Sequence, residues 1–298
     1  MSTLASPTNR DWLTLAFLSL IWGTSYILIK WGLEVFEAEQ VGALRLGISA
    51  LAVSPIALRH LPKIPFRNLG VFLAVGLTGT ALPSFLFPTA QEHLSSSVAG
   101  IFSSLAPVFT FLLAWLVFKA KATKWQGIGI LIGFGGAIIL ATAGGGVADG
   151  EVVPLQFFYV LLIMVACLCY ATSSNLVAHY LQETSSLVIT SVSFFLVGAP
   201  ALLYVVVGTD VVPRVVNHPA GWQALAYVSF LALLSTVLAS YIFFLLVQRT
   251  GPVFSSTVSY LVPAVAVAWG ILDGEWIGLP QVLAFILILI GVFLTKRK

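Results

Sequence analysis

Ten apolar segments, each close to the length that crosses a membrane, fill almost the whole of this 298-residue chain. Hydrophobic residues make up 59% of the sequence and charged residues only 8%, too few to cover the surface of a soluble protein. The hydrocarbon core of a bilayer is about 30 Å thick and needs roughly 20 apolar residues per helix. We predict an all-α polytopic membrane protein of ten transmembrane helices, near residues 12–32, 39–58, 68–88, 95–118, 125–143, 155–178, 185–207, 221–247, 253–272 and 278–294.

The two halves of the chain repeat one another. The segment SSSVAGIFSSLAPVFTFLLAWLVF at residues 95–118 is matched by PVFSSTVSYLVPAVAVAWGIL at residues 252–272. Pro107 falls on Pro263 at a shift of 156 residues, with serine and leucine positions in register before it. Self-similarity at a fixed spacing indicates a duplicated structural unit.

This duplication predicts two five-helix repeats, residues 1–143 and 155–298, joined by a linker at 144–154 outside the membrane. Because five is odd, the second repeat enters the membrane from the opposite side. Inverted repeats of this kind are common in secondary transporters, whose substrate sites lie near the midplane between the halves. A duplicated bundle with a structural or lipid-handling role is the alternative.

Positively charged residues gather on one side of the predicted bilayer. If the N-terminus is cytoplasmic, 11 of the 14 lysines and arginines fall in cytoplasmic loops and tails. Lysine and arginine on the cytoplasmic side set the orientation of membrane proteins. We therefore expect both termini in the cytoplasm, on the side that holds Arg10, Arg59, Lys63, Arg67, Lys119, Lys121, Lys124, Arg249, Lys296, Arg297 and Lys298.

Several short motifs occur in a recognisable order. They are Trp22-Gly-Thr-Ser, Ala43-Leu-Arg45-Leu, Leu105-Ala-Pro107, Leu261-Val-Pro263 and Gly274-Glu275. In this order the chain resembles the EamA-type members of the drug/metabolite transporter superfamily. One position departs from the pattern: the first half has Lys119 where the second half has Glu275.

The resemblance implies a ten-helix basket in which spans 1, 3, 4, 6, 8 and 9 surround a central cavity. Spans 5 and 10 would pack at the periphery. Members of this family commonly export amino acids and related metabolites from bacteria, which implies a location in the cell inner membrane.

Polar side chains inside a bilayer cost free energy unless they face protein, water or substrate. The expected cavity spans carry hydroxyls, one amide and aromatic rings, a neutral set that suits a zwitterion with an apolar or aromatic side chain. The predicted substrate-binding residues are Trp22, Thr24, Ser25, Tyr26, Thr80, Ser84, Phe85, Ser103, Ser104, Tyr170, Ser173, Asn175, Ser240, Tyr241, Ser259 and Tyr260.

Each of these residues also has a structural interpretation. A serine or threonine in a membrane helix can bond back to its own helix or across to a neighbour. An aromatic ring can simply pack between helices. For Asn175, substrate binding and helix–helix bonding both remain open.

Three prolines and two cations stand out within the spans. Pro83, Pro107 and Pro263 each remove a backbone hydrogen bond, so we predict hinges there. Lys30 is expected to reach the outer interface or to pair with Glu34. Arg45 is expected to bond to carbonyls near the outer end of the bundle, with a grip on a substrate carboxylate as the alternative.

Absences narrow the function further. No Asp or Glu lies in the middle of a predicted span, so the usual carboxylate for proton coupling is missing. The four histidines have no metal-ligand spacing, and no nucleophile stands with a plausible base. We expect no enzyme activity, no metal or cofactor and no nucleic-acid partner.

The sequence therefore predicts an inner-membrane exporter of neutral amino acids, including aromatic and large apolar ones, that works by alternating access. Its expected partners are a small-molecule substrate and the lipid bilayer. The oligomeric state stays open, with a monomer possible. A multidrug or cation exporter and a lipid-translocating protein are the alternative functions.

Overall fold

The computed structural model describes residues 7–117, 124–142 and 153–294, and these residues form helices without a strand among them. The predicted linker at 144–154 falls almost wholly outside this range. The elements are α1 (Asn9–Leu33), α2 (Ala38–His60), η1 (Leu61–Lys63), α3 (Phe66–Gly76), η2 (Leu77–Ala81), α4 (Leu82–Gln91), α5 (Ser96–Ser103), α6 (Ala106–Leu116), α7 (Lys124–Thr142), α8 (Val153–Tyr180), α9 (Ser186–Gly208), α10 (Val211–Asn217), α11 (Gly221–Phe230), η3 (Leu231–Leu238), α12 (Ala239–Thr250), α13 (Pro252–Ser255), η4 (Ser256–Tyr260), α14 (Val262–Leu272) and α15 (Leu279–Leu294).

Eight helical spans in the described residues are long and apolar enough to cross a membrane. They coincide with eight of the ten predicted spans. The other two predicted spans correspond to α7 and α15, whose apolar stretches Gly127–Leu140 and Leu279–Gly291 are shorter. The protein is thus a multi-pass, all-helical membrane protein, while the count of ten spans and the inverted repeat stay predictions.

Apolar side chains cover the outside of the bundle and polar side chains lie inside it, as expected for a protein surrounded by lipid. Large apolar residues such as Leu131, Leu203 and Val207 are 65–77% exposed on the outside of the bundle. Polar residues such as Ser49 and Thr110 are almost wholly buried. Because hydrocarbon offers no hydrogen bonds, a helix that satisfies its own backbone is the stable state of each apolar segment.

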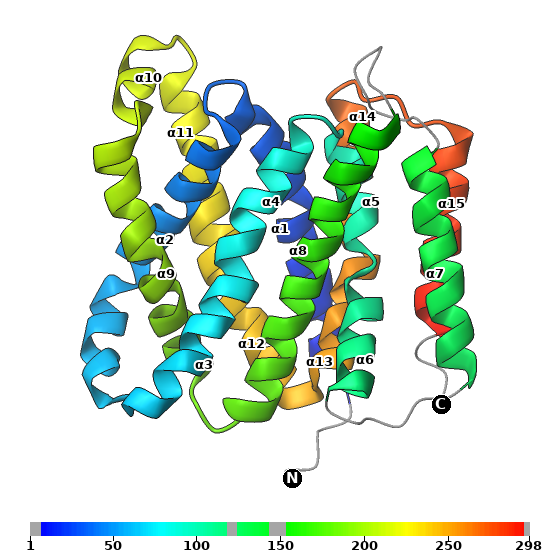
Figure 1. The fold of residues 1–298 in the computed structure, drawn as a ribbon, viewed down its shortest axis with the longest axis horizontal. Helices are drawn as coiled ribbons and strands as arrows, with labels where there is room; N and C mark the ends of the chain where they lie inside the picture. The colour runs from blue at the N-terminus through cyan, green and yellow to red at the C-terminus, as the bar shows by residue number, and fades with distance from the viewer. Residues whose placement is uncertain (1–6, 118–123, 143–152, 295–298) are drawn as a thin grey trace.

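Helices 7 and 15 form a pair at one edge of the bundle, and α2 packs against α9 toward the opposite edge (Figure 1). Between them lie α1, α8 and four spans that are each broken into shorter helices. α1 begins and α15 ends at the same end of the bundle, here called the terminal end; the other is the distal end. The expected peripheral position of spans 5 and 10 agrees with the places of α7 and α15.

Four of the central spans are interrupted near the middle of the bundle. In the third and eighth spans the interruptions are the π-helical segments η2 and η3. In the fourth span α5 ends and α6 begins within three residues, and in the ninth span the 3-10 segment η4 leads into α14. Single π turns and short 3-10 segments inside long helices often occur at functional sites.

Close packing between α5 and α14 depends on a glycine. A methyl group added at Gly100 would lie 2.4 Å from the Cβ atom of Ala266, well inside contact distance. The absence of a side chain at Gly100 therefore lets these two helices approach closely beside the centre of the bundle.

Candidate functional site

A cavity lies among the broken spans and is lined by residues of α1, α2, η2, α4, α5, α6, α8, η3, α12, η4 and α14. Its space free of atoms is about 950 Å³, counting the part that is open to solvent. The expected cavity spans therefore all contribute. The second span contributes too, through Arg45, which the family resemblance did not imply.

The cavity wall brings together nine of the residues predicted to bind substrate. They come from both halves of the chain: Trp22, Ser25, Tyr26, Thr80, Ser103, Tyr170, Ser173, Ser240 and Ser259. The wall also contains polar residues that the prediction omitted, namely Arg45, Thr110, Ser174, Ser235, Thr236 and Ser256. These omitted serines and threonines lie on the same spans as the predicted residues. Their positions on the same helix faces were the sequence signal that could have identified them.

The other seven predicted residues are outside the cavity wall: Thr24, Ser84, Phe85, Ser104, Asn175, Tyr241 and Tyr260. Thr24 accepts a hydrogen bond from the indole of Trp269 at 2.9 Å. Phe85 packs beside Gly42, between buried clusters around α2. Asn175 donates across to the carbonyl of Thr110 at 3.3 Å and along its own helix to Ala171 at 2.8 Å, which is the helix–helix role.

Most cavity hydroxyls use their proton on the backbone. Ser25 donates to the carbonyl of Ile21 at 3.1 Å, and Ser103 donates to the carbonyl of Gly100 at 2.6 Å. Thr110 and Ser174 donate in the same way within α6 and α8. A hydroxyl has one proton and two acceptor lone pairs, so these groups offer the cavity acceptors rather than donors.

Aromatic rings form the apolar part of the wall. The indole of Trp22 is held by a 2.9 Å hydrogen bond to the carbonyl of Ser235 in η3, and its ring meets Phe243 edge-on at 5.2 Å. Phe87 stacks on Tyr170 at 6.1 Å between ring centroids and meets Tyr26 edge-on. The rings are therefore fixed in position before any ligand arrives.

Arg45 is the one cation in the described cavity wall, and its side chain is only 6% exposed. Its Nε donates to the hydroxyl of Thr236 at 2.6 Å. The expected bonds to carbonyls at the outer end of the bundle are thus replaced by a contact with a side chain of η3. The sequence marked Arg45 as unusual because it is a charged residue inside an apolar span. The direction in which its side chain points depends on the packing of α2 against η3, which the sequence does not show.

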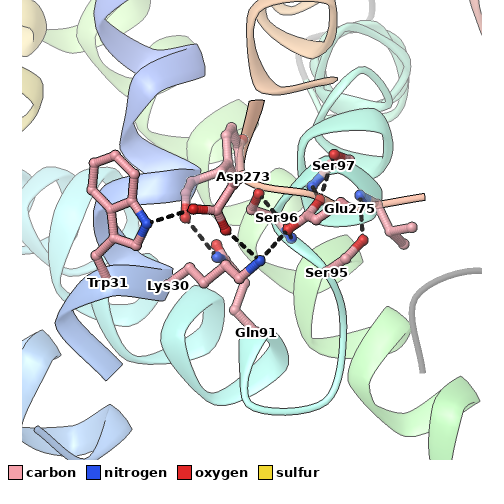
Figure 2. A network of polar contacts seen from close by, with 10 residues as sticks. Lys30, Trp31, Gln91, Ser95, Ser96, Ser97, Asp273 and Glu275 are labelled. Carbon is pink, nitrogen blue, oxygen red and sulfur yellow. Dashed lines mark hydrogen bonds and ion pairs between the residues drawn. The ribbon is translucent and has the colours of Figure 1, made fainter. Parts of the chain in front are cut away.

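A network of charged and polar groups joins three spans at the distal end (Figure 2). Lys30 pairs with Asp273 at 2.7 Å and with Glu275 at 3.0 Å, in place of the predicted pairing with Glu34. Asp273 also accepts from the indole of Trp31 at 2.9 Å. The end of α1 is thereby tied to the loop that follows α14.

Glu275 also caps the start of α5. Its two carboxylate oxygens accept from the backbone and hydroxyl groups of Ser96 and Ser97, at 2.5–3.0 Å. Burial alone would raise the pKa of this carboxyl, but the bonds from Ser97 and Lys30 hold it below the ordinary value of 4.5. Glu275 is therefore a carboxylate whose negative charge the network requires.

Different contacts join the helices at the terminal end. Arg249, at the end of α12, pairs with Asp11 in the first turn of α1 at 2.9 Å. The amide of Gln248 donates to the carbonyls of Leu181 and Thr184 beyond the end of α8, at 2.7 and 2.6 Å. Separate groups of polar contacts thus join the central helices at each end of the cavity.

The three predicted hinge prolines stand at helix starts. Pro107 lies in the first turn of α6, Pro263 in the first turn of α14 and Pro83 in the first turn of α4. A proline is well tolerated there because the N–H groups of the first turn have no acceptor within the helix, so the N–H that proline lacks is not missed. Each proline directly follows an interrupted segment of its span, which is where a hinge would lie.

Comparison with known proteins supports this architecture. The profile of the EamA-like transporter family matches residues 11–142 and, separately, residues 157–297. A solved crystal structure superposes with a TM-score of 0.66 at 17% identity and covers 97% of both chains, which indicates a shared fold.

Relatives of known sequence cover nearly the full chain. An uncharacterized transporter from Archaeoglobus fulgidus is 21% identical over 97% of this chain and 99% of its own. The uncharacterized inner membrane transporter YedA of Escherichia coli K12 is 23% identical over 94% and 91%. A probable terminal-alkyne amino-acid exporter from Streptantibioticus cattleyicolor is 25% identical over 93% and 90%. With the family profile matched over most of its length, the chain belongs to the EamA-like transporter family.

Proposed function

We propose that the protein exports neutral amino acids, including aromatic and large apolar ones, across the inner membrane by alternating access. The central cavity holds the substrate in this proposal. Both termini lie in the cytoplasm, so the distal end faces outward. The two five-helix halves, residues 1–143 and 155–298, move relative to one another to expose the cavity on either side.

The observation that carries the proposal is the chemistry of the cavity wall. Four hydroxyl groups of the wall donate their protons to backbone carbonyls: Ser25, Ser103, Thr110 and Ser174. Their lone pairs can therefore accept hydrogen bonds from an ammonium group. The aromatic rings of the wall offer faces for an apolar or aromatic side chain.

The relative named as a probable terminal-alkyne amino-acid exporter lends support to this substrate class. The described cavity wall contains no Asp or Glu. A permanent organic cation would be expected to need such a group, so the wall favours a zwitterion over the substrates of a multidrug exporter. For the same reason we propose transport down the substrate gradient rather than exchange for protons.

The two ends of the cavity suit alternating access. The Lys30–Asp273–Glu275 network joins α1, α5 and the end of α14 at the distal end, and the Arg249–Asp11 pair joins α12 to α1 at the terminal end. We propose that the distal network breaks when the cavity opens outward and that the Arg249–Asp11 pair breaks when it opens inward. The helices bend at Pro83, Pro107 and Pro263 in this proposal.

Counterflow in proteoliposomes tests the proposal. Purified protein is loaded with unlabelled phenylalanine, methionine or threonine, and uptake of the labelled compound is measured with and without a pH gradient. A quaternary ammonium dye, a nucleotide sugar and a fluorescent phospholipid serve as the competing substrate classes. Saturable amino-acid counterflow that needs no pH gradient is the expected result.

Other outcomes would overturn it. Dye movement driven by the pH gradient, with amino acids inert, would make the protein a multidrug exporter. Movement of the phospholipid between leaflets, with both other classes inert, would make it a lipid-translocating protein.

A further inference from the structure

We propose that Arg45 binds the carboxylate of the transported amino acid, which makes the cavity selective for substrates that carry this group. This inference rests on the proposed function and specifies the chemistry at one pole of the same site. It follows from the burial of the guanidinium, from the way the protein holds it and from the neighbours it has.

Burial of the charge is the first step. Arg45 is 6% exposed, lies inside α2 and borders the cavity. A buried charge is costly unless it is paired with an opposite charge. Among the residues that the structure describes, no carboxylate forms an ion pair with Arg45. Lys30 and Arg214, which are partly buried near the distal end, each pair with two carboxylates.

Hydrogen bonds between α2 and η3 hold Arg45 in place. Ser49, one turn along α2, donates to the carbonyl of Arg45 at 2.7 Å and reaches the carbonyl of Ala232 in η3 at 3.2 Å. Thr236 accepts from Nε of Arg45 at 2.6 Å and bonds to the carbonyl of Leu231 at 3.1 Å. The π-helical segment η3 therefore presents Thr236 to the guanidinium and fixes one edge of it.

Tyr170 lies within hydrogen-bonding reach of the guanidinium. A guanidinium carries five N–H groups, of which Nε–H is used by Thr236. Tyr170 and Tyr26 are close enough for the charge of Arg45 to act on their hydroxyls, and both residues line the cavity. The planar Nη groups, together with the hydroxyl of Tyr170, form a set of donors that suits a carboxylate bound through two oxygens.

The two poles of the cavity wall are therefore complementary. Arg45 and the neighbouring Tyr170 offer donors, whereas Ser25 and Ser174 offer acceptors because their protons are used by the backbone. A carboxylate suits the first group and an ammonium suits the second. A zwitterionic amino acid carries both on adjacent atoms.

The first experiment needs no variant. Counterflow of labelled phenylalanine by the wild-type protein is competed with phenylalanine, with phenylalaninamide and with phenethylamine, which keep the ring and the nitrogen but lack the carboxylate. We expect the amide and the amine to compete at least about tenfold more weakly, because a charge-assisted contact contributes roughly 1.5–3 kcal/mol. Equal competition by all three compounds would overturn the inference.

The second experiment uses Arg45→Gln and Arg45→Lys, with Arg59→Gln as the matched control, an exposed arginine on the same helix. Arg45→Gln should lose about 10- to 100-fold in apparent affinity for phenylalanine, and its preference for the acid over the amide should fall to near one. Arg45→Lys should recover part of the preference, because it keeps the charge but loses the bidentate geometry. Arg59→Gln should behave as the wild type.

A bound inorganic anion is the competing explanation of the unpaired charge. Counterflow in chloride is therefore compared with counterflow in gluconate. Amide and acid that compete equally, with transport that requires chloride, would assign Arg45 to chloride and overturn the inference. Failure of the wild type to move any amino acid would instead refute the proposed function.

Discussion

Hydroxyl groups around the cavity act through their lone pairs more than through their protons. Ser103 donates to Gly100 and Thr110 donates to Ala106, each within its own helix. The sequence shows that these residues are polar and lie on the right spans, but not which atom the cavity receives. That choice follows from side-chain rotation inside a helix, where the nearest acceptor is a carbonyl one turn back.

Asn175 is a buried amide that bonds between two helices, and we predict a structural role for it. Its side chain is 5% exposed and donates to carbonyls of α6 and α8. We predict that Asn175→Leu destabilises the protein by about 1–3 kcal/mol, because the partner carbonyl is left unsatisfied. Thermal unfolding in detergent would show a lower midpoint, while the apparent affinity for substrate would be unchanged in counterflow. A changed affinity with unchanged stability would restore Asn175 to the binding site.

Gly100 is one of the residues whose missing side chain allows two helices to pack closely. We predict that Gly100→Ala lowers the free energy of unfolding by about 1–3 kcal/mol, because the new methyl group would lie 2.4 Å from Ala266. Gly70→Ala is the matched control, since nothing lies within 4 Å of a methyl group at that position. Thermal melting of both variants would check this, and equal midpoints would contradict the close α5–α14 packing.

At the scale of helices, the interruptions of the third, fourth, eighth and ninth spans define the site. The prolines that end two of these interruptions, Pro107 and Pro263, were visible in the sequence as a pair at equivalent positions of the two halves. The π-helical segments η2 and η3 were not, because nothing in the composition of Leu77–Ala81 or Leu231–Leu238 distinguishes a π turn from another part of a helix. A π turn is a product of packing that a sequence pattern does not reveal.

The paired prolines carry a prediction about motion. We expect the double variant Pro107→Ala/Pro263→Ala to slow counterflow by about tenfold, equivalent to about 1.4 kcal/mol in the barrier, with little change in affinity. Alanine would let the helix ladder continue through the interruption and stiffen the hinge. The matched control is Pro55→Ala/Pro200→Ala, two prolines inside α2 and α9. Equal rates for both double variants would reject the hinge role.

The distal network predicts a pH dependence. Since the folded pKa of Glu275 lies below 4.5, its ionised contacts are fully present above pH 4.5 and are lost only as the pH falls through the lower folded value. The distal closure should therefore be insensitive to pH from neutrality down to about 5 and should weaken only in more acidic solution.

A charge-neutral variant should loosen the same closure at neutral pH. In a background with Cys167→Ala and Cys169→Ala, a Ser103→Cys thiol in the cavity would be labelled from outside by an impermeant methanethiosulfonate reagent. We predict several-fold faster labelling in Glu275→Gln than in its parent, because the ion pair with Lys30 is lost. Glu34→Gln, an exposed carboxylate at the same end, is the control. Unchanged labelling in Glu275→Gln would show that the network does not close the cavity.

At the scale of the whole molecule, the membrane class and the order of the spans could be predicted from hydropathy alone, because lipid forces apolar segments into helices. Eight predicted spans coincide with structural ones. The central cavity came from the family resemblance, and its wall holds nine predicted residues. Arg45 and Lys30 were placed differently, since their partners Thr236 and Glu275 lie in the other half of the chain, and no local pattern connects positions that far apart.

The central claim is that a neutral amino acid occupies the cavity among the broken spans during transport. Counterflow of labelled phenylalanine by Ser240→Trp and Leu245→Trp tests it most directly, because the first residue lines the cavity and the second is exposed on the outer face of the same helix, α12. The account predicts saturable counterflow in the wild type and in Leu245→Trp, with loss of transport in a folded Ser240→Trp. Full transport by Ser240→Trp would contradict it.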